Sequence, residues 1–245
     1  MTRFHRLTLP ACLVAMLPVA ANADEYRAQL DLTYDRLDFD RPLVPDGDAL
    51  GVAATYFFSP VVTDDRPLAE AAFLGRSSFV GAGAVRSELG DEKIDIFGAG
   101  IGYYLPNTIF YGELNYTYSH DFGGDQDRVS GALGLAPIDG LLVTTRFDED
   151  GWDPNASAKY VGKLPNAHWY AATIDLAEFD DDLVWAAFFD YYFDPTFSAG
   201  LGLAENVTTL RAEKFFTPSF SVGARFDLGN DQGSNAYGAQ ISWRF

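Results

Sequence analysis

The sequence predicts an all-β protein, a transmembrane antiparallel up-and-down β-barrel of about 14 strands. Three observations predict it: many short segments alternate apolar and polar residues, the chain begins with an export signal, and it ends in the aromatic residue Phe245. Successive side chains of a strand point to opposite faces, so alternation is expected where one face meets apolar surroundings and the other meets water. A barrel crosses a membrane with strands of only about 10 residues.

The first 23 residues have the pattern of a secretory signal peptide. Arg3 and Arg6 form a positive start, an apolar run follows, and Ala21-Asn22-Ala23 matches the small-x-small cleavage pattern. Cleavage there would leave residues 24–245 as a single transmembrane β-barrel domain. The only cysteine, Cys12, lies within the signal, so the mature chain is expected to have no disulfide and no thiolate metal site.

The mature chain is strongly acidic. The whole chain has 17 basic and 35 acidic residues, and removal of the signal leaves 15 basic against 35 acidic residues, a net charge of −20. This charge disfavours nucleic acid as a partner. An aromatic content of 15% and 23 glycines are unlike a disordered acidic chain. No mature segment has about 18 uninterrupted apolar residues, which excludes membrane-spanning helices.

The alternation is clearest in four segments, residues 26–34, 110–118, 220–226 and 237–245. Their apolar faces begin and end in aromatic residues, as expected at the two interfaces of a membrane. Their polar faces carry ionised groups in mid-strand, which a water-filled lumen tolerates. A soluble β-sandwich would also alternate, but these two features favour a membrane barrel.

Prolines mark the expected strand exits. An aromatic pair, a spacer and a proline recur at 56–60, 103–106, 192–195 and 215–218, and Pro137 and Pro165 fill the gaps in the series. Proline cannot donate to a strand ladder, so we interpret all six as short periplasmic turns. The acidic segments between them, which contain glycine and asparagine, are expected to form the outer loops.

The resulting pattern predicts 14 strands, and the even number suits two termini in the periplasm. Twelve strands is the alternative, because glycines blur the phase of the alternation between residues 77 and 104. The predicted strands are 25–36, 48–58, 77–87, 93–104, 109–119, 127–136, 141–148, 156–164, 168–177, 183–193, 197–205, 207–216, 220–228 and 236–245.

Residues 61–76 break the strand pattern. Two acids and Pro67 precede the good helix formers of 68–74, which predicts a helical turn. This turn would either cover the base of the barrel on the periplasmic side or fold into the lumen as a plug.

The same region carries a family resemblance. Tyr56-Phe57-Phe58-Ser59-Pro60-Val61, followed by Pro67-Leu68-Ala69-Glu70-Ala71-Ala72-Phe73-Leu74, resembles a stretch of the porin family of proteobacterial outer membranes. The resemblance implies a small outer-membrane β-barrel over the whole mature chain and a channel function, and it names no substrate. The chain is shorter than the large trimeric porins, which disfavours a wide pore and a trimer and leaves the oligomeric state open.

An outer-membrane enzyme is the main competing class of protein. Such enzymes activate a nucleophile or water with histidine near the outer rim, and the mature chain has only His120 and His168. Ser119, His120 and Asp121 are consecutive, but neighbours on a strand point to opposite faces and are not expected to share a site. The acidic runs 148–150 and 180–182 lack the spacing of an EF-hand calcium loop. We therefore predict no catalytic residue, no cofactor and no metal site.

The phase of the strands predicts which charged residues face the lumen. The predicted pore-lining residues are Arg27, Asp31, Asp35, Glu113, Arg146, Asp175, Asp190, Arg211, Glu213, Arg225, Asp227 and Arg244. Asp95, Arg86, Arg128, Lys159 and Lys163 share this phase, which gives a nearly balanced lumen of eight acids and nine bases. The outer loops are predominantly acidic.

The function expected from these features is passive diffusion of small hydrophilic solutes or ions through a porin-like channel, with a weak cation preference from the acidic loops. The alternative is a non-conducting structural or adhesin-like barrel, because 14 strands lie between the filled interior of eight and the aqueous channel of about 16. A lipid-modifying enzyme is a further alternative. We expect the protein in the bacterial outer membrane, among lipid and lipopolysaccharide, with its C-terminal strand recognised by the barrel assembly machinery.

Overall fold

The computed structural model describes residues 25–39, 45–121, 124–149, 155–165, 167–179, 182–229 and 234–245. The signal peptide predicted for residues 1–23 lies outside these ranges and stays a prediction.

Within the described ranges the chain forms fourteen strands and one short helical segment. The strands are β1 (Glu25–Phe39), β2 (Gly47–Val62), β3 (Phe79–Leu89), β4 (Glu92–Tyr104), β5 (Phe110–Asp121), β6 (Gly124–Leu135), β7 (Leu141–Asp148), β8 (Ala156–Lys163), β9 (Trp169–Phe179), β10 (Asp182–Asp194), β11 (Phe197–Ala204), β12 (Val207–Thr217), β13 (Phe220–Gly229) and β14 (Ser234–Arg244). The helical segment consists of η1 (Leu68–Glu70) and α1 (Ala71–Leu74).

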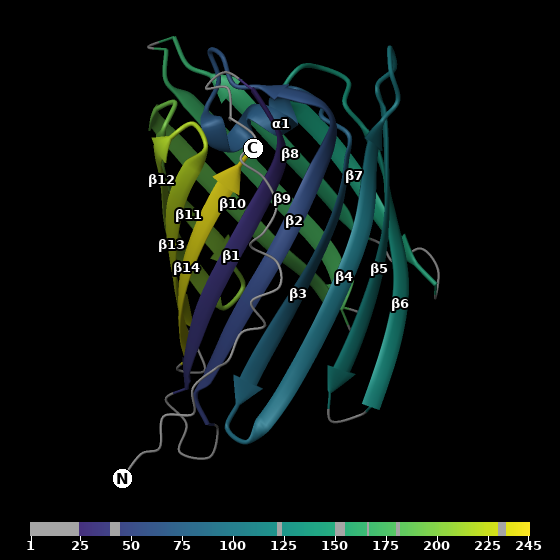
Figure 1. The fold of residues 1–245 in the computed structure, drawn as a ribbon, viewed down its shortest axis with the longest axis vertical. Coiled ribbons are helices and arrows are strands. Elements are labelled where there is room, and N and C mark those ends of the chain that lie inside the picture. The colour runs from purple at the N-terminus through teal and green to yellow at the C-terminus, as the bar shows by residue number, and fades with distance from the viewer. Residues whose placement is uncertain are drawn as a thin grey trace.

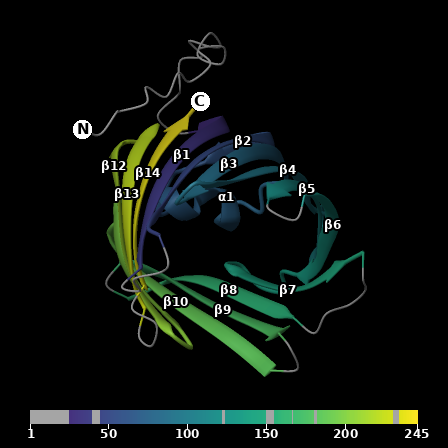
Figure 2. The same ribbon diagram turned by 90° about the horizontal axis from the view of Figure 1, so that it is seen from below.

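The strands form one closed barrel in which each strand pairs with its neighbours in sequence and β1 pairs with β14 (Figures 1 and 2). All pairs are antiparallel, as an up-and-down barrel requires. The predicted fold class and strand count are confirmed, and the alternative of twelve strands is wrong.

The seam between β1 and β14 is continuous. It runs in register from Gln29 opposite Arg244 to Phe39 opposite Ser234. Phe245 extends it, since its N–H donates to the carbonyl of Ala28 at 2.9 Å. The last residue of the chain therefore takes part in closing the barrel.

The two faces of the wall differ as the alternation predicts. On β5, Leu114 and Tyr116 are 52% and 47% exposed on the outer face, while Glu113 and Asn115 face the lumen and hydrogen-bond to each other. Among the described residues, no helix is long and apolar enough to span a membrane.

The two ends of the barrel also differ. The segment 63–78 and the turns that contain Pro106, Pro137, Pro165, Pro195 and Pro218 lie at one end, which we call the turn end. The opposite end, the loop end, holds the connections that the sequence assigns to the outside. Five of the six predicted proline turns are found, whereas Pro60 lies inside β2 and the connection follows it.

A β-bulge corrects the expected position of Arg27. The N–H groups of Arg27 and Ala28 both donate to the carbonyl of Phe245, at 2.6 and 3.0 Å, and the β1–β2 register shifts between Tyr26 and Ala28. The bulge interrupts the alternation, so Tyr26 is buried in the lumen against Phe57 and the side chain of Arg27 is exposed. None of the described charged side chains forms an ion pair with Arg27.

The expected lumen positions of Arg86 and Asp95 are wrong. Arg86 lies opposite Leu50 and Asp95, and Leu50 is 42% exposed on the outer face. Directly opposed residues share a face, so the bidentate pair of Arg86 with Asp95 lies on the outside of the barrel. The glycines of β3 and β4 carry no side chains from which the sequence could reveal this phase.

Exchange of one residue on each face of β5 tests the membrane orientation of the wall. We expect Leu114→Arg to destabilise the refolded barrel by about 2–4 kcal/mol, because Leu114 lies between the aromatic ends of an apolar band. Asn115→Arg is the control, since it places the same side chain in the lumen beside Glu113. Urea unfolding in lipid vesicles measures both, and equal losses would contradict the assignment of the faces.

Candidate functional site

The lumen has two unlike walls. One wall, which we call the ionic wall, is formed by lumen-facing charged residues of β1 and β10–β14. These residues are Asp31, Asp35, Asp190, Arg211, Glu213, Arg225, Asp227 and Arg244. The other wall, which we call the small-residue wall, is formed by β2–β5. Its lumen-facing residues include Gly51, Ala53, Thr55, Gly81, Gly83, Gly98 and Gly100.

A single row of registered residues organises the ionic wall. Across neighbouring strands, the row reads Asp190, Gly200, Arg211, Arg225, Gly238, Asp35. The two arginines are directly opposite each other, which is unfavourable for like charges. A glycine and then an acid follow on either side, so the row is symmetric about the arginine pair.

The acids draw the two arginines apart. Arg211 donates through Nε to Asp190 at 2.7 Å and makes a second bond to the same carboxylate through Nη2. Arg225 donates through Nη2 to Asp35 at 2.8 Å. Each ion pair spans an intervening strand, and this is possible because the intervening residue is glycine. A Cβ at Gly200 would lie 2.1 Å from Asp190 Oδ1, and a Cβ at Gly238 would lie 2.5 Å from Asp35 Oδ1.

Further bonds fix the remaining acids of this wall. Arg225 Nε lies 3.0 Å from Asp227, which also accepts a hydrogen bond from Thr209. Ser242 and Gln29 donate to Asp31. Ser221, itself 1% exposed, donates to Glu213 at 2.7 Å. The acids and bases of the ionic wall are therefore engaged with partners inside the wall.

The segment 63–78 packs against the lumen-facing residues Val161, Ala171 and Tyr192 at the turn end of the barrel, as the plug alternative predicts, and Figure 2 shows α1 within the outline of the strands. Its Glu70 is only 6% exposed. Glu70 accepts a hydrogen bond from Tyr192 of β10 at 2.8 Å and forms an ion pair with Lys159 of β8 at 2.7 Å. The ammonium of Lys159 also lies 4.7 Å from the centre of the Phe73 ring.

The other side of this plug is held at the seam. Arg244 of β14, 5% exposed, donates to the carbonyl of Leu68 at 2.9 Å, and its guanidinium lies 4.6 Å from the ring of Tyr26. Ala71 is fully buried in a cluster with Tyr26 and Phe57. The plug thus connects the β1–β14 seam with β8 and β10 across the lumen.

The small-residue wall borders the larger open space. A cavity of about 570 Å³ extends along β2–β6 and is lined by these glycines and alanines together with Thr33, Asn115 and Thr117. A second cavity of about 390 Å³ lies against the ionic wall and reaches Ala69 and Glu70 of the plug.

The remaining predicted pore-lining residues lie on β5, β7 and β9. Glu113 accepts hydrogen bonds from Tyr111 at 2.6 Å and Asn115 at 2.8 Å. Arg146 lies in the same row, two strands from Glu113. Asp175 is registered with Ser157 and has no ion-pair partner among the described residues.

Of the residues predicted to face the lumen, seven acids and seven bases do so once Arg86, Asp95 and Arg27 are removed. The acids are Asp31, Asp35, Glu113, Asp175, Asp190, Glu213 and Asp227, and the bases are Arg128, Arg146, Lys159, Lys163, Arg211, Arg225 and Arg244. Glu70 adds an eighth acid that sequence reasoning missed, because no strand phase applies to the plug.

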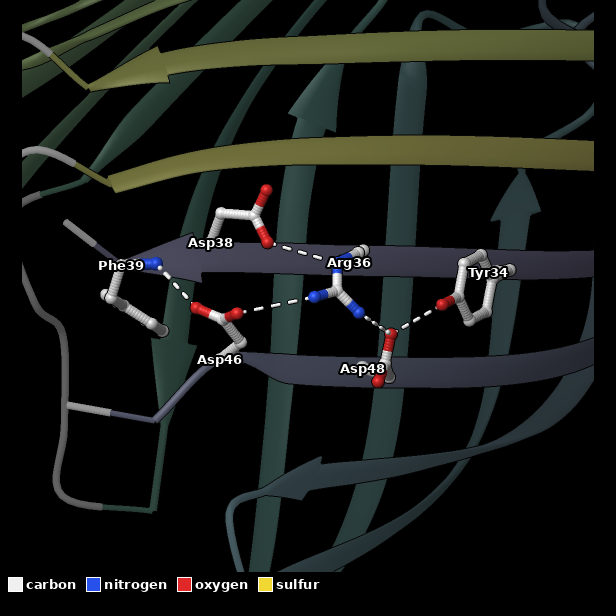
Figure 3. A network of polar contacts seen from close by, with 6 residues as sticks. All are labelled: Tyr34, Arg36, Asp38, Phe39, Asp46 and Asp48. Atoms are coloured by element: carbon white, nitrogen blue, oxygen red, sulfur yellow. Dashed lines mark hydrogen bonds and ion pairs between the residues drawn. The ribbon is translucent and has the colours of Figure 1, made fainter. Parts of the chain in front are cut away.

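A separate polar network lies on the outer face at the loop end (Figure 3). Arg36 is within 3.0 Å of Asp38, 3.3 Å of Asp46 and 3.6 Å of Asp48. Tyr34, 46% exposed, donates to Asp48. This network ties the loop ends of β1 and β2 together outside the lumen.

The consecutive Ser119 and His120 do not share a site, and the side chain of Asp121 lies outside the described part of the structure. Nδ1 of His120 lies 2.6 Å from Asp125 on the exposed outer face, and Ser119 belongs to the opposite phase of β5. No group of three or more His, Cys, Asp or Glu side chains that could hold a metal ion occurs in the part of the chain that the structure describes. Asp180 and Asp181 lie outside that part.

Comparisons with known proteins agree on the fold. No family model and no curated protein matches the chain. The structure is similar to the crystal structure of the Acinetobacter baumannii outer membrane protein Omp33, with 22% identity over 91% of this chain and 100% of that chain and a TM-score of 0.78. It is also similar to a bacterial polysaccharide outer membrane secretin, with 12% identity over 90% of this chain and 99% of that chain and a TM-score of 0.53. The fold and its apolar exterior are those of a bacterial outer-membrane β-barrel.

Loss of the Glu70 anchor tests how the plug is held. We expect Glu70→Ala to speed trypsin cleavage at Arg76 in the refolded barrel, because the variant removes a buried acceptor and leaves Lys159 without its partner, at a cost of about 1–3 kcal/mol. Asp139→Asn is the control, since Asp139 is a fully exposed partner of Arg76 at 3.6 Å. Cleavage at the wild-type rate in Glu70→Ala would contradict this anchoring.

Proposed function

We propose that the protein is an outer-membrane channel for passive diffusion of small hydrophilic solutes and ions. The observation that carries the proposal is a closed barrel of fourteen strands with an apolar exterior and a lumen lined by ionised and hydroxyl-bearing side chains. Eight-stranded barrels are filled by their side chains, whereas about 16 strands enclose an aqueous channel. Here the cavities of about 570 and 390 Å³ leave room for water and small solutes beside the plug.

Recording in planar bilayers tests this function. A channel gives discrete conductance steps that scale with the number of inserted barrels. Purified, correctly folded barrels that insert without such steps would instead support a non-conducting structural or adhesin-like role.

We further propose a weak preference for cations. The lumen is nearly balanced in charge, but the loop end is not. Its described acids include Asp46, Asp48, Glu88, Asp91, Glu92, Asp125, Asp127, Asp148, Glu149, Glu178 and Glu205, against Arg36, Arg86 and Lys93. A negative mouth concentrates cations, and salt screens the effect beyond about 8 Å at physiological ionic strength.

Neutralisation of loop-end acids tests the origin of this preference. The combined change Asp91→Asn, Glu92→Gln, Glu149→Gln and Glu205→Gln should move the reversal potential of the channel toward zero in a gradient of dilute KCl. The same measurement near 1 M salt is the control, because a screening length of about 3 Å should remove the difference. Anion preference of the unmodified channel at low salt would contradict the proposal.

We propose that the barrel assembly machinery recognises the C-terminal strand, and that lipopolysaccharide borders the loop end of the barrel. The support for recognition of the strand is the position of Phe245 at the seam, where its backbone already bonds to Arg27 and Ala28. Phe245 lies at the turn end of the seam, so the turn end would then face the periplasm.

A side-chain exchange separates recognition of Phe245 from closure of the barrel. Phe245→Ser keeps the backbone bonds of the seam and removes the ring, and we expect it to lower the outer-membrane level of the protein. Phe216→Ser is the matched control, because Phe216 is an exposed aromatic residue at the same end of the barrel. Equal levels of the two variants in outer-membrane fractions would contradict the role of Phe245.

A further inference from the structure

We infer that solutes cross the barrel along the small-residue wall of β2–β5, and that this path favours small neutral solutes with hydroxyl groups. The inference rests on the proposed channel function and specifies its route and its class of solute.

Two registered rows of small residues leave open space above the small-residue wall. The first joins Ala53, Gly83 and Gly98, and the second joins Thr55, Gly81 and Gly100. In the next row, Thr33 lies opposite Gly51, where a Cβ would be 2.4 Å from the Thr33 hydroxyl, and the row continues to Val85 and Ile96. The absence of side chains at these glycines lets neighbouring polar groups lie flat on the wall. The result is the cavity of about 570 Å³.

The ionic wall offers a poorer route. Its long side chains project into the lumen and are fixed by ion pairs, such as Arg211 with Asp190 and Arg225 with Asp35. The smaller cavity beside them ends on the plug at Ala69 and Glu70, where Glu70 is held by Lys159. A solute on this side would have to displace these ion pairs.

The chemistry of the larger cavity indicates the class of solute. Its polar lining consists mainly of hydroxyl and amide side chains, namely Thr33, Thr55, Asn115, Thr117 and Ser130. Hydroxyls and amides both donate and accept hydrogen bonds, so they can replace water around a hydroxylated solute. The one charged lining residue, Asp31, already accepts bonds from Ser242 and Gln29. An ionised solute would therefore lose hydration here without gaining an unpaired counter-charge.

Three glycines offer matched positions for a test. A Cβ on Gly98 would have only the carbonyl of Tyr116, at 3.8 Å, within contact distance, and it would project into the larger cavity. A Cβ on Gly223 would meet only ordinary contacts at 3.6 and 3.7 Å and would project into the smaller cavity. Gly112 belongs to the outer phase of β5 and has nothing within 4 Å.

The experiment uses single cysteines and a bulky neutral thiol reagent, because the only cysteine, Cys12, lies in the predicted signal peptide. Gly98→Cys, Gly223→Cys and Gly112→Cys are small changes, and each barrel is modified with benzyl methanethiosulfonate only after it has assembled. We expect the single-channel conductance of Gly98→Cys to fall by at least about half on modification, because an aromatic ring would occupy the larger cavity. Gly223→Cys should change much less and Gly112→Cys not at all.

Solute flux completes the test. In vesicles in 1 M KCl, where loop charges are screened to about 3 Å, wild-type barrels should pass glucose faster than gluconate or glucosamine, which are similar in size. Modification of Gly98→Cys should slow all three solutes.

The possible failures are distinguishable. A conducting wild-type channel in which modified Gly98→Cys and Gly223→Cys lose equal conductance would overturn the inferred route and leave the channel function intact. Faster passage of glucosamine or gluconate than of glucose would overturn the inferred class of solute. Wild-type barrels that conduct nothing would overturn both the inference and the proposed function.

Discussion

Pairing of β1 with β14 is the interaction on which the rest of the structure depends. Hydrocarbon offers no partner for backbone N–H and C=O groups, so a sheet can cross a membrane only if it has no edge. The seam satisfies these groups along eleven registered pairs from Gln29 opposite Arg244 to Phe39 opposite Ser234. The bulge at Arg27 is the local adjustment that lets Phe245 join the seam while Tyr26 turns into the lumen.

The seam also determines what the lumen contains. Because β14 closes on β1, Arg244 reaches the carbonyl of Leu68 and Gln240 and Ser242 reach Asp31. The same closure brings Arg225 of β13 within 2.8 Å of Asp35 of β1, although 190 residues separate them in the chain. These contacts of the plug and of the ionic wall therefore depend on closure of the barrel and not on local sequence.

The sequence predicted most of the fold because two of its signals are local. Alternation with period two is visible within each strand, and proline marks the strand exits, so the number of strands and most of their boundaries follow from short segments. The signals fail where the side chains that report the phase are missing. In β3 and β4 the lumen side holds Gly81, Gly83, Gly98 and Gly100, which have no side chains that could indicate the lumen face. This is the region in which the sequence assigns Arg86 and Asp95 to the wrong face.

The sequence identifies most residues of the site but not the contacts that they make. The strand phase identifies Asp190, Arg211 and Arg225 as facing the lumen, but the partner of each depends on barrel register across a glycine on a third strand. Glu70 was missed because its position inside the barrel depends on Lys159 of β8 and Tyr192 of β10, and both residues are far from Glu70 in the sequence. Neither arrangement has a signature in a short segment.

Glycine has opposite effects on the two walls, and this difference shapes the lumen. On the ionic wall, Gly200 and Gly238 are gaps that long side chains fill, since the Asp190–Arg211 and Asp35–Arg225 pairs pass directly over them. On the small-residue wall, Gly98 has no long neighbour to cover it, so the space above it stays open. The ion pairs need these glycines because a Cβ would overlap a carboxylate, and the open space needs glycine because any larger side chain would project into it. The positions of these glycines thus separate a wall of internally bonded charged side chains from an open wall of small residues.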